Sequence, residues 1–232
     1  MKAAYLQALN VERAARRACV LVTDLAQGAQ RLVLADQIAA DPLHVEIDTA
    51  LRMGKSGMVE HGTGRFFLTV QAPPLRIVVV GAVHVSQALA SMAHLLGHRV
   101  IVVDPRTAFA SKERFPDADL MAQWPDEALP VVGIDRYTAF VALTHDPKID
   151  DPGLAAALHS DCFYVGALGS RKTHAKRLDR LAAAGFGPHQ LARIHAPIGL
   201  DIGAVSPAEI ALSIMAEITA AQRKKPERPT GS

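Results

Sequence analysis

The chain lacks most of the features that mark secreted, membrane and nucleic-acid-binding proteins. It has only two cysteines, Cys19 and Cys162, in 232 residues, too few for a disulfide framework and without metal-ligand spacing. Its 25 basic residues nearly balance 23 acidic ones, so the net charge of +2 gives little attraction for nucleic acid or membranes. No apolar run approaches the roughly 20 residues that span a bilayer. We therefore expect a cytoplasmic globular protein without nucleic-acid or membrane partners.

Familiar catalytic motifs are missing as well. The sequence contains no serine nucleophile elbow, Walker loop, HExxH or CxxC. The first residues run into a charged helix without the apolar region of a signal peptide. Both cysteines lie in or beside apolar segments, where a packed thiol is the ordinary interpretation. The residues alone therefore indicate no catalytic constellation and no metal site.

What is present predicts two α/β domains and a tail. Residues 1–74 read as a small domain with a helix over 3–16, strands at 19–22, 31–34 and 66–70, and a helix over 42–53 capped by Asp41. The paired prolines at 73–74 suit a linker, because proline resists both helix and central strand. Residues 75–222 read as a larger Rossmann-like domain with a parallel sheet, and 223–232 as a disordered polar tail.

The larger domain alternates strands and helices. Strands are expected at 77–80, 100–103, 119–121, 139–143 and 163–168, with an apolar helical face over 85–96 that stops at Gly97. A short helix is expected from the Asp-Pro pair at 151–152 to about residue 159. Ser170 can cap a helix over 171–184, and the capping box that starts at Ser206 begins the last helix.

The turn after the first of these strands resembles a damaged dinucleotide fingerprint. The three positions of the G-x-G-x-x-G pattern read Gly81, Val83 and Ser86, and His84 lies between the last two. Gly81 permits the tight turn, and the helix start that follows offers free N–H groups to a phosphate. Val83 places a branched side chain where a pyrophosphate usually meets bare backbone. The pattern predicts either a phosphate-bearing ligand or a Rossmann-like unit without one.

Polar or glycine residues also follow the other strands, where ligands of open parallel sheets bind. Asp104 could accept hydrogen bonds from a ribose, or could be a turn residue before Pro105 and Arg106. Two clusters have similar alternatives. Thr144, His145 and Asp146 form either a ligand contact or a polar turn. Gly166, Gly169, Ser170 and Arg171 form either a second anion site or the start of a solvated basic helix.

The charges later in that helix, Lys172, Lys176, Arg177 and Arg180, are expected to be solvated, because they lie beyond the reach of the helix terminus. The glycine-rich segment from His195 through Asp201 to residue 204 is either a binding loop or a simple connection.

Several separated strings together carry a family resemblance. They are GAVHVSQAL, VVDPR, ERFP, LTHDPKIDDP, FYVGALGSRKTHAKRL and HAPIGLDIGAVSPAEIALSIMAEI, in order over 75–222. This region resembles the Rossmann domain of the xanthine dehydrogenase accessory protein family, also called the carbon monoxide dehydrogenase maturation-factor family. Two features depart from it. Val83 stands where a glycine is usual, and the N-terminal part is a short form without the family's GGC and CGG motifs, in which only GRFFLTVQAPP resembles the end of that domain.

The resemblance implies a cofactor-binding chaperone rather than an enzyme that turns over a metabolite. It would bind the molybdenum cofactor (molybdopterin), assist its sulfuration and deliver it to an apo molybdenum hydroxylase of the xanthine dehydrogenase type. A cysteine desulfurase and a homodimer are further implied associations. We expect Gly81–Ser86 and Gly169–Arg171 to contact the phosphate, and Asp104, Thr144, His145 and Asp201 to orient the pterin. The alternatives are an NAD(P)-dependent oxidoreductase and a nucleotide-binding sensor or docking module.

Overall fold

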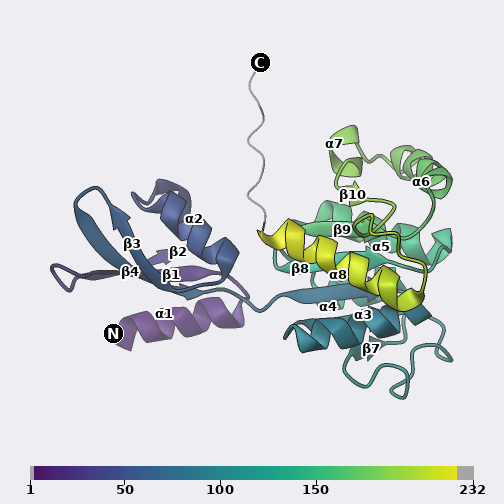
Figure 1. Cartoon of the computed structure of the whole chain (residues 1–232), viewed down its shortest axis with the longest axis horizontal. Coiled ribbons are helices and arrows are strands. Elements are labelled where there is room, and N and C mark those ends of the chain that lie inside the picture. The colour runs from purple at the N-terminus through teal and green to yellow at the C-terminus, as the bar shows by residue number, and fades with distance from the viewer. Residues whose placement is uncertain (1–2, 224–232) are drawn as a thin grey trace. The chain divides into compact units, whose positions relative to one another are not determined.

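The chain divides into two compact units, residues 1–73 and 74–232, coloured in sequence in Figure 1. The computed structural model describes residues 3–223. The predicted tail therefore lies outside the described residues, apart from Arg223. None of the described helices combines the length and the apolar character needed to cross a bilayer.

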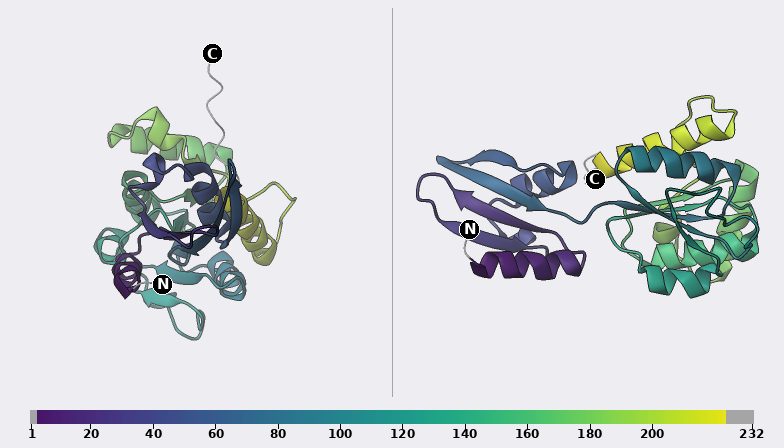
Figure 2. Two further views of the ribbon diagram at one scale, coloured as in Figure 1. Left: turned by 90° about the vertical axis from the view of Figure 1, so that its left-hand side faces the viewer. Right: turned by 90° about the horizontal axis from the view of Figure 1, so that it is seen from below.

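The first unit is an antiparallel sheet with helices. Its strands β1 (Cys19–Asp24), β2 (Gln30–Leu34), β3 (Gly57–His61) and β4 (Gly64–Gln71) lie in the order β2-β1-β4-β3. Helix α2 (His44–Met53) packs Ile47 against Val20, Val22 and Leu68, and helix α1 (Ala3–Ala14) lies on the other face of the sheet (Figure 2). The hairpin of β3 and β4 turns at Gly62, and β3 was not predicted.

The start of α2 differs from the prediction. A 3-10 turn, η1 (Ile38–Ala40), comes first, and α2 begins at His44 with Leu43 before it, so Asp41 is not the helix cap. The Asp41 carboxylate instead accepts hydrogen bonds from the Leu43 N–H at 2.8 Å and from Arg31 Nη2 at 2.7 Å. Asp41 therefore fastens the turn between two elements, which is a tertiary role that the Asp-Pro pattern alone does not reveal.

The second unit contains a sheet whose strands are all parallel, as the Rossmann prediction required, with six strands where five were predicted. Its strands are β5 (Arg76–Val80), β6 (Arg99–Val103), β7 (Asp119–Met121), β8 (Thr138–Ala142), β9 (Tyr164–Ala167) and β10 (Ile194–His195), in the order β10-β9-β8-β5-β6-β7. The chain moves outward from β5 to β7, returns to β8 and then moves outward the other way. The strand order therefore reverses between β5 and β8, at the usual Rossmann position.

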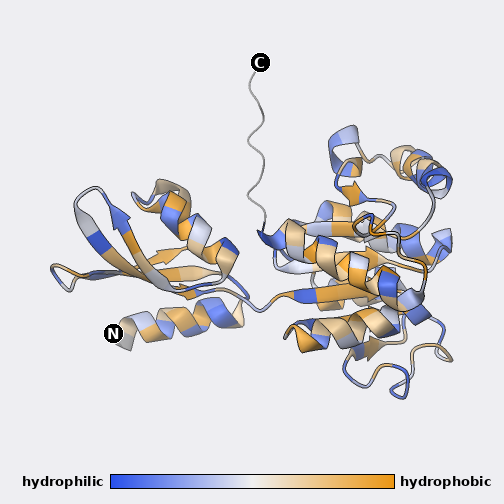
Figure 3. Cartoon of the chain, viewed as in Figure 1, coloured by the Kyte–Doolittle hydropathy of each residue, from blue (hydrophilic) through white to orange (hydrophobic). Residues whose placement is uncertain are grey.

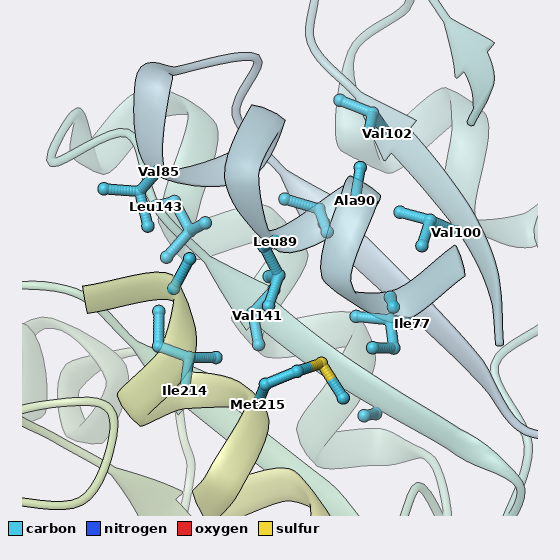
Figure 4. Close-up of a cluster of buried hydrophobic side chains, with 14 of the residues drawn as sticks. Ile77, Val85, Leu89, Ala90, Val100, Val102, Val141, Leu143, Ile214 and Met215 are labelled. Atoms are coloured by element: carbon cyan, nitrogen blue, oxygen red, sulfur yellow. The ribbon is translucent and has the colours of Figure 1, made fainter. Parts of the chain in front are cut away.

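Helices cover both faces of this sheet. Helices α3 (His84–Leu95) and α8 (Pro207–Arg223) lie on one face, and α4 (Pro125–Val132), α5 (Pro147–His159) and α6 (Arg171–Ala183) on the other. Figure 4 shows Leu89 of α3 with Val141 of β8 and Ile214 and Met215 of α8. The central strands β5, β6, β8 and β9 are apolar almost throughout, as Figure 3 shows, because they are buried on both faces.

The structure confirms the five predicted strands of this unit to within two residues at each end, together with the helices after Gly81, Ser170 and Ser206. One helix start was wrong: α5 begins at Pro147 with Asp146 as its N-cap, whose side chain accepts from the Lys148 N–H, and Pro152 lies inside the helix. Helix α4, the short helix α7 (Pro188–Leu191) and strand β10 were not predicted.

Candidate functional site

The parallel pairing places most of the predicted site residues at one edge of the sheet. Gly81–Ser86 follow β5, Asp104 follows β6, Thr144–Asp146 follow β8, Gly166–Arg171 end and follow β9, and His195 ends β10. We call this edge the carboxyl rim. Asp201 lies in the exposed loop between β10 and α8. Ligands of open α/β sheets bind at this rim, next to the reversal of strand order.

The Gly81 turn uses much of its hydrogen-bonding capacity internally. Gly81 has φ +115°, and a Cβ there would lie 2.7 Å from Thr144 Cγ2, so the loops after β5 and β8 touch. The Ser86 hydroxyl is buried, accepts from the Val83 N–H at 2.7 Å and donates to the Gly81 carbonyl at 2.6 Å. Val83 is the extended N-cap, with φ −102°, so this position needs no positive φ. The exposed His84 is the first helical residue.

Asp104 occupies the bottom of the same turn. Its carboxylate is fully buried and accepts from the Ala82 N–H at 2.7 Å, while Arg106 pairs with both of its oxygens at 2.9 and 2.7 Å. Burial alone would raise the pKa of Asp104, but these hydrogen bonds outweigh it and the pKa lies below its ordinary value. The structure thus shows the turn role of Asp104. A ribose would have to displace Arg106 to reach it.

These contacts use the N–H groups of Ala82 and Val83, so an anion at the Gly81 turn competes with Asp104 and Ser86. The predicted phosphate contacts of Gly81, Val83, His84 and Ser86 remain predictions.

The loop after β8 is fastened by a carboxylate that the sequence did not single out. Asp150, buried in the first turn of α5, accepts from the Thr144 N–H and hydroxyl and from the His145 N–H, at 3.2, 2.7 and 3.0 Å. His145 consequently has φ +66°, a conformation uncommon outside glycine. Burial raises the pKa of Asp150, and the hydrogen bonds from Thr144 oppose that rise. The exposed Asp146 caps α5.

The segment after β9 forms the predicted helix start. Ser170 Oγ accepts from the Thr173 N–H at 3.2 Å, Gly169 has φ +136°, and Arg171 is exposed at the first helical position. Gly166, by contrast, serves packing: it is buried inside β9, and a Cβ there would collide with the side chain of Ile198.

A cleft of about 240 Å³ lies at the rim between α5 and α6, and we call it the basic cleft. Its lining comes from both sides: His145, Pro147 and Asp150 on one, and Lys172, Thr173, Lys176, Arg177 and Arg180 on the other. The prediction that the later charges of α6 are solvated holds for Lys172, Lys176 and Arg180, which are exposed, but is wrong for Arg177, of which only 2% is exposed.

Arg177 has unfulfilled hydrogen-bonding capacity inside this cleft. Its Nη2 donates to the Leu168 carbonyl at 2.9 Å and lies 3.9 Å from Asp150 Oδ2. Its Nε and Nη1 are buried and have no hydrogen-bond partner among residues 3–223. Burial lowers the pKa of the guanidinium, and Asp150 opposes that shift. Leaving a buried donor unpaired costs about 1–3 kcal/mol, so the fold bears a penalty here that a ligand could relieve.

His195 belongs to a separate cluster. His195 Nδ1 lies 3.0 Å from Glu217 Oε1, and the Tyr164 hydroxyl and the Gly199 N–H donate to Glu217 Oε2 at 2.5 and 2.7 Å. Glu217 thereby ties α8 to β9, β10 and the loop that follows. Asp201 is exposed, and the structure does not bring its carboxylate into this cluster.

Comparisons with known proteins agree with this architecture. The XdhC Rossmann domain family matches residues 77–218. A probable xanthine dehydrogenase component from Bacillus subtilis (strain 168) is 32% identical over 163 residues, which is 70% of this chain and 47% of that protein. "Molybdenum cofactor insertion chaperone PaoD" of Escherichia coli (strain K12) is 31% identical over 155 residues, 67% of this chain and 42% of that protein. The chain thus spans less than half the length of either relative.

A solved structure described as a xanthine dehydrogenase from Bacillus halodurans has the same fold. The TM-score is 0.66 at 23% identity, and the match covers 97% of this chain and 66% of the other. Because 97% of this chain is covered, the likeness extends through both units.

Proposed function

Because the chain belongs to the xanthine dehydrogenase accessory protein (XdhC) family, as its Rossmann domain shows, we propose that it binds the molybdenum cofactor and delivers it to a molybdenum hydroxylase. The relative named as a cofactor insertion chaperone supports the role. The single structural observation that carries the proposal is the basic cleft at the carboxyl rim, where four cationic side chains face one carboxylate, Asp150.

The residues present fit this cofactor, a pterin with a terminal phosphate. Lys172, Lys176 and Arg177 supply positive charge for the phosphate, and a cleft of about 240 Å³ suits an anionic group better than a whole pterin. The pterin would then lie over the loops at the rim, near Thr144 and His145. When bound, the cofactor supplies the molybdenum chemistry, and the protein would hold and shield it.

We assign sulfuration to a partner, of which a cysteine desulfurase is the proposed one. Sulfur transfer needs an accessible thiolate. Cys19 and Cys162 are buried, at 1% and 4% exposure, and burial raises the pKa of both thiols. Cys162 Sγ also donates to the Ala157 carbonyl at 3.4 Å. Neither thiol is placed to carry sulfur, so this chain would present the cofactor to its partners.

Purification from cells that make the cofactor tests the proposal. The full chain should carry pterin and molybdenum at near-stoichiometric levels, measured by pterin fluorescence after oxidation and by elemental analysis, and should associate with an apo molybdenum hydroxylase. Absence of both pterin and molybdenum would refute it.

The alternative of an NAD(P)-dependent oxidoreductase predicts saturable micromolar binding of NAD(H) or NADP(H). The occupied Asp104 carboxylate argues against that outcome, because a ribose hydroxyl would compete with Arg106 and the Ala82 N–H.

A further inference from the structure

We propose that the basic cleft, and not the Gly81 turn, is the phosphate site of this protein, with Arg177 as its central ligand. The inference rests on the proposed function, since the phosphate is taken to be the terminal phosphate of the bound pterin. It specifies which part of the rim recognises the anionic end and which residues do so.

The Gly81 turn is poorly suited to an anion. The Asp104 carboxylate already accepts the Ala82 N–H, and Ser86 Oγ accepts the Val83 N–H. A phosphate there would have to displace the buried Asp104 carboxylate or the Ser86 hydroxyl from these donors. The glycine turn therefore has the shape of a phosphate loop, but the N–H groups of Ala82 and Val83 already bind acceptors of the protein itself.

The basic cleft has the opposite character. Arg177 is only 2% exposed yet lines the cleft, and in the part of the chain that the structure describes its Nε and Nη1 have no hydrogen-bond partner. Guanidinium N–H groups match two phosphate oxygens in a planar fork. Within residues 3–223, Lys172 and Lys176 make no ion pair, whereas Arg180 is paired with Asp151 at 2.5 Å. One buried fork and two exposed ammonium groups thus converge on a small volume.

The size of the cleft indicates what it can take. Sites for drug-sized ligands measure roughly 300–1,000 Å³, and this cleft measures about 240 Å³. It can accommodate a phosphate monoester end and leaves the rest of the ligand at the rim, beside His145.

Calorimetric titration of the full chain with inorganic phosphate and pyrophosphate tests the site directly. We expect saturable binding that weakens with salt, and at least a tenfold loss of affinity in the double variant Lys172→Ala/Lys176→Ala. Arg177→Lys should lose at least as much, because a lysine cannot form the fork. The control is Lys55→Ala, an exposed lysine of the first unit, which removes a charge and should bind as the wild type does.

The double variant keeps the test sound if Arg177→Lys folds poorly, because both lysines are exposed. Absent phosphate and pyrophosphate binding, or affinity equal in the wild type and the double variant, would overturn the proposal.

The cofactor content of the same variants distinguishes failure of the cleft as phosphate site from failure of the proposed function. Pterin retained equally by the double variant rejects the cleft but keeps the proposed function. Pyrophosphate binding by a wild type that never carries pterin supports the cleft and rejects that function.

Discussion

Gly81 is held in a conformation that other residues adopt only with strain. Its φ is +115°, and a Cβ would lie 2.7 Å from Thr144 Cγ2. We expect Gly81→Ala to lower the free energy of unfolding by about 2–4 kcal/mol, from backbone strain and the displaced Thr144 loop together. Gly97→Ala is the matched control, because Gly97 also has positive φ but open space around its Cβ position. Equal losses in urea denaturation would show that the contact with Thr144 does not matter.

Asp104 should stabilise the fold in a pH-dependent way. Its pKa in the folded state lies below the ordinary 3.8, because hydrogen bonds from Arg106 and Ala82 outweigh the effect of burial. A lowered carboxyl pKa contributes stability that is present above the ordinary value and is lost as the pH falls through the folded value. Asp104→Asn should therefore cost about 2 kcal/mol near neutral pH.

The stability gap between wild type and Asp104→Asn should be constant from about pH 5 to 8 and shrink below about pH 4. Denaturant melts across this range measure it, with Asp117→Asn as an exposed control. A stability difference that widens as the pH falls would contradict a lowered pKa of Asp104.

Helix α8 depends on its capping box. Ser206 Oγ accepts from the Glu209 N–H at 3.3 Å, and Glu209 Oε2 accepts from the N–H groups of Val205 and Ser206 at 2.9 and 2.7 Å. Ser206→Ala should lower the free energy of unfolding of the second unit by about 1 kcal/mol, and Ser206→Asp should restore it. Thermal melts of both variants check this. An Ala variant as stable as the wild type would show that packing of Ile214 and Ile218 alone holds the helix.

Elements with local signals could be predicted from the sequence. The box at Ser206, the cap at Ser170 and the apolar strands all appear as expected, because each depends on a few neighbouring residues. The start of α5 was missed because Asp146-Pro147 and Asp151-Pro152 carry the same signal a short distance apart. A tertiary contact selects the Asp146-Pro147 pair as the helix start, because the Asp150 carboxylate then accepts hydrogen bonds from Thr144 and His145.

The candidate site, too, could be predicted from the sequence only in part. The rim and its glycine turn followed from the order of strands and polar residues along the chain. The sequence could not identify Arg177 as a buried residue of the site, because its burial depends on the packing of α6 against α5. Its partner Asp150 also lies 27 positions earlier (177 − 150). On a helix with a basic pattern, a charge that faces inward and one that faces solvent look alike in sequence.

At the scale of the whole molecule, the two units have separate hydrophobic cores. Leu68, fully buried, packs with Ile47 and Val20 in the first unit, whereas the cores on the two sheet faces of the second unit contain none of these residues. Leu68→Ala should therefore destabilise residues 3–73 by about 2–5 kcal/mol and leave the basic cleft able to bind pyrophosphate. Hydrogen exchange measured by mass spectrometry should show lost protection in β1, β2 and β4 but not in β5, β8 or β9.

Leu154→Ala, in the core beside the cleft, should give the reverse pattern and weaken pyrophosphate binding, because Leu154 packs α5 onto the sheet. Loss of protection in both units with either variant would mean that the molecule unfolds as one cooperative body.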